Sequence, residues 1–176
     1  NSLSGTSFGA QEIWAANGSN EIIQSLFMAF GERPALGFTP SYSMHPLIAK
    51  VIGTKWNDGG RRADFSLDLA KAISDIAKVK PGLTFITTPN NPTGTTVTLA
   101  EIEDLAIATG KINGLLIVDE AYAEFSDQAS AVTLLAKYSN LVVIRTMSKA
   151  FAFAGARLGY LVANKELVSA MFLVRL

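Results

Sequence analysis

The feature of this sequence that most constrains its fold is a regular alternation. Short apolar runs rich in β-branched residues are separated by longer segments with helical periodicity. Strands are expected at residues 35–39, 50–56, 83–88, 114–121, 141–146 and 158–163. Helices are expected over 20–30 and 67–77, and a capping box at Thr98 and Glu101 begins a third helix that ends near Gly110. This alternation predicts an α/β domain with three layers, in which helices cover both faces of a mainly parallel mixed sheet.

Composition excludes several classes of function. The chain of 176 residues has equal numbers of basic and acidic side chains, 15 of each, which argues against a large nucleic-acid surface. It has no cysteine and a single histidine, His45, so thiolate and multi-histidine metal sites are excluded. No apolar run approaches the length of a membrane span. We expect a cytoplasmic protein with neither a membrane nor a nucleic-acid partner.

The two ends of the sequence indicate a longer parent protein. The chain opens without methionine and closes at NKELVSAMFLVRL, an apolar helical pattern without a stop signal. An apolar helix needs a surface to bury against, and none follows it. We therefore expect an internal piece of a longer chain.

Polar side chains follow three of the expected strands, and in α/β sheets ligands bind beyond the carboxyl ends of the strands. Asn91 lies in the turn PNNPTG, Asp119 and Tyr122 lie in DEAYAEF, and Lys149 lies in MSKAF. Taken singly, these segments also fit a tight turn, an acidic helix start and an exposed lysine. Two further segments resemble parts of a binding site. Gly18, Ser19 and Asn20 precede a helix whose free amides could bind an anion or simply be capped, and Tyr42 lies in a turn after a strand.

Together these groups match one cofactor, pyridoxal 5′-phosphate (PLP). PLP has a phosphate, a flat ring, a basic ring nitrogen, a phenolic oxygen and an aldehyde. We predict that a desolvated Lys149 binds the aldehyde and that Asp119 keeps the ring nitrogen protonated. We give structural roles to four other features: packing or a helix start for His45, a solvated turn for residues 59–65, and core positions for Trp14 and Trp56.

Over essentially its whole length the chain resembles the fold-type I, class I/II aminotransferases. The segments that carry the resemblance are WAANGSNEI, GFTPSYSMHP, PNNPTG, IVDEAYAEF and RTMSKAFAFAGARLGY. The set, in this order and spacing, is specific for the family and less specific for the substrate.

The resemblance implies a role for each motif residue. Lys149 binds the cofactor covalently and moves the proton between substrate and cofactor, while Asp119 pairs with the ring nitrogen. Tyr122 and Asn91 donate hydrogen bonds to the phenolic oxygen, and Tyr42 stacks on the ring. The remaining residues bind the phosphate or admit it closely, namely Arg157, Ser148, Thr146, Ser19, Asn20 and Gly18.

The resemblance also implies a domain and a reaction. Residues 1–176 are expected to be part of the PLP-binding large domain, without the family's N-terminal arm and C-terminal small domain. The full-length parent is expected to be a homodimer that acts on a small amino donor and a 2-oxo acid. The nearest similarity is to enzymes that transaminate L-histidinol phosphate with 2-oxoglutarate in histidine biosynthesis. Alternatives are an aromatic amino acid aminotransferase, a threonine-phosphate decarboxylase, and the non-catalytic PLP-binding module of a transcription regulator.

Overall fold

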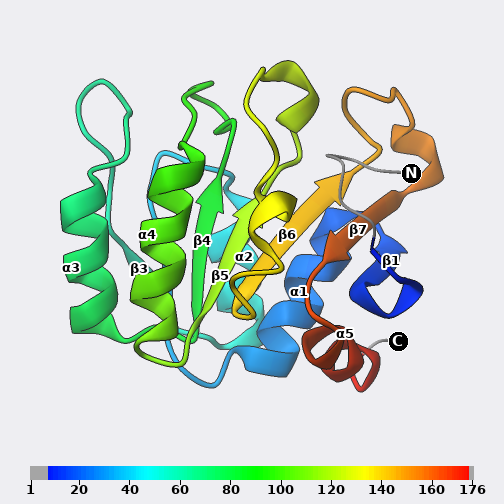
Figure 1. The fold of residues 1–176 in the computed structure, drawn as a ribbon, viewed down its shortest axis with the longest axis horizontal. Helices are drawn as coiled ribbons and strands as arrows, with labels where there is room; N and C mark the ends of the chain where they lie inside the picture. Colours follow the sequence, from blue (N-terminus) through cyan, green and yellow to red (C-terminus); the bar gives the residue numbers. More distant parts are fainter. Residues whose placement is uncertain (1–7, 175–176) are drawn as a thin grey trace.

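A mixed sheet of seven strands organises the protein, as a computed structural model that describes residues 8–174 shows (Figure 1). The strand order is β1-β7-β6-β5-β4-β2-β3. Strands β2 to β6 are mutually parallel, whereas β7 runs antiparallel to both β6 and β1. The strands are β1 (Ile13–Asn17), β2 (Ala35–Gly37), β3 (Trp56–Asp58), β4 (Leu83–Thr87), β5 (Leu115–Asp119), β6 (Leu141–Thr146) and β7 (Leu158–Val162).

Helices cover both faces of this sheet, so the predicted three-layer α/β class is confirmed. The helices are α1 (Ser19–Phe30), α2 (Met44–Ile52), α3 (Leu69–Val79), α4 (Leu99–Gly110) and α5 (Lys165–Phe172). Short 3-10 turns are η1 (Ala10–Glu12), η2 (Ala123–Phe125), η3 (Ala131–Leu134) and η4 (Ala154–Ala156). One core joins α1, α2 and α5 to the sheet and contains the buried Trp14, and a second core joins α3, α4 and η3 to the opposite face. Figure 1 shows α3 and α4 side by side over that second face.

The predicted element boundaries were right for most of the sheet and wrong near residue 50. The expected strand over 50–56 does not form, because α2 extends to Ile52 and ends at Gly53 in a left-handed conformation with φ of 89°. The following strand, β3, begins only at Trp56. Strand β1 and helix α2 were not predicted. The alanine-rich β1 has little β propensity of its own and forms by pairing with β7.

The topology places four connecting loops at one edge of the sheet. The carboxyl ends of β2, β4, β5 and β6 all lie at this edge, drawn uppermost in Figure 1. The predicted site residues come mostly from these loops. Among residues 8–174, no helix is long and apolar enough to cross a bilayer. Residues 1–7 and 175–176, which belong to the two chain ends discussed above, lie outside the described part.

Candidate active site

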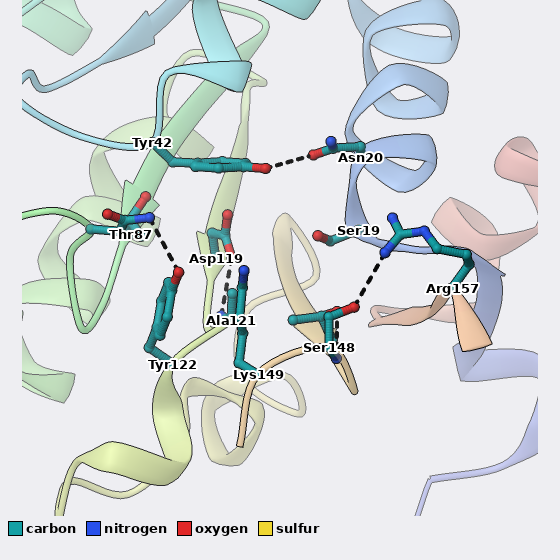
Figure 2. Close-up of a pocket in the computed structure, with 12 residues that line it drawn as sticks. Ser19, Asn20, Tyr42, Thr87, Asp119, Ala121, Tyr122, Ser148, Lys149 and Arg157 are labelled. Atoms are coloured by element: carbon teal, nitrogen blue, oxygen red, sulfur yellow. Dashed lines mark hydrogen bonds between the residues drawn. The ribbon is translucent and has the colours of Figure 1, made fainter. Parts of the chain in front are cut away.

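A cavity of about 110 Å³ lies at the carboxyl edge of the sheet (Figure 2). It is lined by Ser19, Asn20, Tyr42, Thr87, Asn91, Asp119, Ala121, Tyr122, Thr146, Ser148, Lys149 and Arg157. The structure thus brings every predicted site residue except Gly18 to one cavity. Thr87 and Ala121 were not predicted as site residues, although Thr87 lies in the expected strand 83–88 and Ala121 lies in the segment DEAYAEF. No group of side chains suited to a metal ion occurs among the described residues.

Asp119 is the buried acid of the cavity. It ends β5 with 2% of its surface exposed, and its Oδ1 accepts a hydrogen bond from the Ala121 amide at 3.1 Å. His45 Nε2 lies 3.1 Å from Asp119 Oδ2, and His45 is also 2% exposed. The imidazole sits in the first turn of α2, with its ring centroid 4.7 Å from that of Phe85 and 5.4 Å from that of Tyr42. The packing and helix-start roles predicted for His45 are both correct, but no sequence pattern indicates its contact with Asp119.

Two polar pairs define the sides of the cavity next to Asp119. The Asn91 side-chain amide donates to the Tyr122 hydroxyl at 3.2 Å, which joins the loop after β4 to the loop after β5. The Tyr42 hydroxyl donates to Asn20 Oδ1 at 3.0 Å, and Figure 2 shows the Tyr42 ring lying across the cavity. The arrangement leaves a flat slot beside one aromatic ring, with hydroxyl and amide groups at its rim.

A hydrogen-bonded turn around Asn90 supports the backbone that carries Tyr42 and Asn91. Asn90 is 3% exposed, and its amide donates to the Pro40 carbonyl at 3.0 Å and to Thr93 Oγ1 at 2.7 Å. The Asn90 side-chain oxygen, Oδ1, accepts a hydrogen bond from Ser41 Oγ at 2.8 Å. Since Pro40 and Ser41 precede Tyr42 and Asn90 precedes Asn91, this single side chain connects the two loops. Sequence reasoning singled out Asn91 and missed its neighbour.

Lys149 lines the cavity between Tyr122 and Ser148 (Figure 2) and is exposed in the described chain. Its Nζ is 5.6 Å from the centroid of the Tyr122 ring, as a cation facing an aromatic surface. Residues 149–158 are all exposed, although seven of these ten residues are apolar or aromatic. The prediction of a desolvated lysine was therefore wrong for this part of the protein, because no described element packs over the segment.

Arg157 and the start of α1 form an anion site beside Lys149. Arg157 Nη1 lies 3.5 Å from Ser148 Oγ and 3.3 Å from the Ala154 carbonyl, and within residues 8–174 no carboxylate pairs with it. Gly18 has φ of 82°, and a Cβ there would meet Arg157 Nη2 at 2.5 Å. Gly18 thus leaves room for the guanidinium where it lies, and its positive φ is a conformation that favours glycine.

Helix α1 adds free amides to this anion site. It begins at Ser19, and no side chain caps it. Its first amides and the Arg157 guanidinium therefore face the same end of the cavity, which suits a phosphate group. Thr146 stiffens the neighbouring turn, because its hydroxyl accepts from the Ser148 amide at 3.2 Å.

Two structural roles assigned from the sequence need correction. The loop 59–65 is not simply a solvated turn, because Arg61 donates to the carbonyl oxygens of Phe38 and Phe65 at 3.1 and 3.2 Å. Burial lowers the pKa of Arg61. Trp14 is a core residue as predicted, whereas Trp56 is only partly buried against the core.

Comparison with known proteins places this geometry in a family. The family model for aminotransferase class I and II matches residues 3–175. The chain is 56% identical over 167 residues to the histidinol-phosphate aminotransferase of Nocardia farcinica, which covers 93% of this chain and 43% of that protein.

Solved structures agree with this assignment. The histidinol-phosphate aminotransferase of Clostridium acetobutylicum superposes with a TM-score of 0.86 at 29% identity, over 94% of this chain and 49% of that one. The Sinorhizobium meliloti enzyme, solved in complex with pyridoxal-5′-phosphate, gives 0.87 at 24% identity, over 98% and 47%. The chain spans about half the length of the relatives it matches. It belongs to the aminotransferase class I and II family.

Proposed function

We propose that the protein is a PLP-dependent aminotransferase of histidine biosynthesis. It would transfer the amino group of L-histidinol phosphate to 2-oxoglutarate and give imidazole acetol phosphate and glutamate. The observation that carries the proposal is the cavity itself, which is lined by a buried acid, a lysine, and an arginine that has no acidic partner in the described part of the chain. The 56% identity to a relative named for histidinol phosphate supports the choice of substrate.

The residues of the cavity fit PLP at each of its functional groups. Arg157, Ser148 and the first amides of α1 would bind the phosphate, and Gly18 leaves room for the guanidinium. Tyr42 would stack on the ring. Asp119 would pair with the ring nitrogen. A nearby carboxylate favours the protonated, positively charged form of that nitrogen.

The chain's own groups divide the chemical work. When bound, PLP withdraws electrons from the α-carbon of the substrate. Asp119, which lies 3.1 Å from His45, would keep a proton on the ring nitrogen. Asn91 and Tyr122 would donate to the phenolic oxygen. Lys149 Nζ would hold PLP between turnovers and, when released, move a proton at the substrate α-carbon.

The same proposal extends to the whole protein. The residues described would belong to the large domain, and a small domain beyond it would complete the substrate site. A homodimer would cover the exposed segment 149–158, where Phe151 and Phe153 are 47% and 52% exposed. We place the protein in the cytoplasm, where biosynthetic transaminations of this kind use soluble substrates.

Steady-state kinetics on the protein at its full natural length test the proposal. We expect the highest kcat/KM with L-histidinol phosphate among amine donors, with 2-oxoglutarate as acceptor. Equal or better turnover of phenylalanine would indicate an aromatic aminotransferase instead. Release of carbon dioxide from threonine phosphate would indicate a decarboxylase. PLP binding without turnover of any donor would indicate a non-catalytic module.

A further inference from the structure

A buried cluster of charges lies next to the cavity but on the other side of β5. Asp119 contacts α2, whereas the next residue, Glu120, contacts the start of η3. Glu120 is 3% exposed, and its carboxylate accepts hydrogen bonds from Arg145 Nη1 at 2.7 Å, Ser130 Oγ at 2.6 Å and the Ala131 amide at 2.7 Å. This one side chain therefore fastens the end of the loop 121–130 to its beginning.

A second carboxylate reaches the same arginine. Arg145 Nη2 donates to Glu124 Oε1 at 2.5 Å, and Glu124 lies in the short turn η2. Arg145 is 6% exposed and comes from β6, the strand next to β5. Glu120 and Glu124 stand two residues before and two residues after Tyr122. Tyr122 therefore lies between two glutamates that both bind the Arg145 guanidinium. We call this group of three residues, Arg145, Glu120 and Glu124, the Arg145 clamp.

The clamp is built to fix geometry. A buried ion pair seldom stabilises a fold more than apolar packing would, so fixing the loop geometry is the better account of this one. Burial lowers the pKa of Arg145, but Glu120 and Glu124 outweigh that effect and the net shift is upward. The guanidinium therefore stays charged, and its planar fork holds both carboxylates at once. None of the three side chains lines the cavity.

Tyr122 has few other constraints inside its loop. Its hydroxyl meets Asn91 at 3.2 Å, and its carbonyl accepts from the Phe125 amide at 3.0 Å. Phe125 is 69% exposed and gives little packing support. The loop is thus attached to the sheet mainly through the two glutamates.

We propose that the Arg145 clamp positions the Tyr122 hydroxyl in the cavity, so that Glu120, Glu124 and Arg145 act through Tyr122 without touching the reacting atoms. The inference rests on the proposed function for its spectroscopic test, since Tyr122 would there donate to the phenolic oxygen of PLP. It makes a separate structural claim about the loop 121–130 that does not need the cofactor.

Glu124→Ala in the full-length protein tests the clamp. The Glu124 side chain is 21% exposed, so its removal leaves the Glu120–Arg145 pair intact and the fold in place. The first readout is the pH midpoint of the absorbance of bound PLP. A hydrogen bond to the ionised phenolic oxygen lowers that midpoint, so a displaced Tyr122 should raise it by about half a pH unit or more.

The second readout is hydrogen–deuterium exchange of the amides of residues 122–126 in protein without PLP. We expect about fivefold faster exchange in Glu124→Ala, because a single anchored end remains. Arg145→Lys should give at least the same effect, since one ammonium cannot span both carboxylates. Glu124→Gln should recover more than half of both effects, because its amide oxygen still accepts from Arg145.

Glu103→Ala is the matched control, because Glu103 makes an ion pair of 2.7 Å with Lys137 on the surface. It should change neither readout. An unchanged midpoint together with unchanged exchange in Glu124→Ala would overturn the clamp. If the unaltered protein fails to bind PLP, the proposed function fails, and the exchange measurement alone still decides whether the clamp orders the loop.

Discussion

The two ends of the cavity are built in different ways. At the acidic end, Asp119 and His45 are both 2% exposed and lie within hydrogen-bonding distance of each other. At the cationic end, Lys149 and Arg157 are exposed, and within residues 8–174 the Arg157 side chain makes two hydrogen bonds, of 3.3 and 3.5 Å. The acidic end is part of the sheet core, whereas the cationic end lies on a loop.

This difference shows which part of the site the described chain organises by itself. A buried carboxylate must have partners wherever it lies, so the fold provides them before any ligand arrives. Lys149 and Arg157 have no acidic partner among residues 8–174, and as exposed cations they are stable in water before a phosphate and an aldehyde bind. We therefore expect changes at the cationic end to weaken binding and chemistry, and changes at the acidic end to alter the fold as well.

The largest expected effect is that of Lys149→Ala on turnover. Loss of the amine removes the proton carrier, so kcat should fall by about 10³-fold or more. Because Lys149 is exposed and supports no packing, the thermal midpoint of the PLP-free protein should stay within about 1 °C of the unaltered value. Single-turnover kinetics and calorimetry check the two parts. A fall in kcat below tenfold would remove Lys149 from its proposed role.

Arg157→Ala should weaken cofactor binding. An arginine bound to a phosphate contributes a charge-assisted hydrogen bond, so the Kd for PLP should rise by about 10- to 100-fold. Fluorescence titration of the PLP-free protein measures it. Arg62→Ala is the control, because Arg62 is also exposed but pairs with Asp68 at 3.3 Å. Equal effects of the two variants would mean that Arg157 contributes only general charge.

His45→Phe should damage both stability and activity at the acidic end. Phenylalanine fills the space beside Phe85 but leaves Asp119 Oδ2 without its partner, which should cost about 1–3 kcal/mol of unfolding free energy. We expect kcat to fall by about tenfold. His45→Gln, which can still donate, should recover part of both losses. Denaturant unfolding that matches the unaltered protein would show that the contact is not needed.

The smallest effect concerns Asp58, which accepts from the Thr39 and Gly60 amides at 2.9 Å each. Burial raises the pKa of Asp58. The hydrogen bonds from Thr39 and Gly60 and the charge of Lys71 together lower this pKa by more than burial raises it, so the net shift is downward. Its contribution is therefore present above the unfolded pKa, about 3.9, and is lost as pH falls through the folded value.

Asp58→Asn should accordingly reduce the unfolding free energy at pH 7 by less than about 1 kcal/mol, since Asp58 is exposed. Below the folded pKa the difference between the two proteins should vanish. Urea unfolding at several pH values measures this difference. A loss that grows as the pH is lowered would contradict the assigned direction.

Local patterns were enough to predict most of the fold. Thr98 and Glu101 form the expected capping box, and β6 spans the residues predicted for it. The errors came from tertiary effects. The apolar run at 50–56 fits a strand by composition, yet Gly53 divides it between a helix and a strand. Strand β1 exists because β7 lies beside it, which no local pattern reveals.

The site residues could be predicted because most lie directly after strands or at a helix start. Their supports could not be predicted in this way. His45 reaches Asp119 across 74 positions of sequence, and Arg145 reaches Glu120 across 25. No sequence motif marks either spacing, because both contacts depend on how α2 and β6 pack against β5. The exposure of Lys149 was also missed, because apolar neighbours in sequence do not bury a residue unless another element covers them.

The measurement that tests the central claim most directly is to mix the protein with PLP, reduce it with borohydride and map the modified lysine by mass spectrometry. The account predicts one adduct, on Lys149, which disappears in Lys149→Ala. Lys137 and Lys165 are exposed lysines outside the cavity and serve as internal controls. No adduct, or labelling spread over those surface lysines, would contradict the assignment of this cavity as the PLP site.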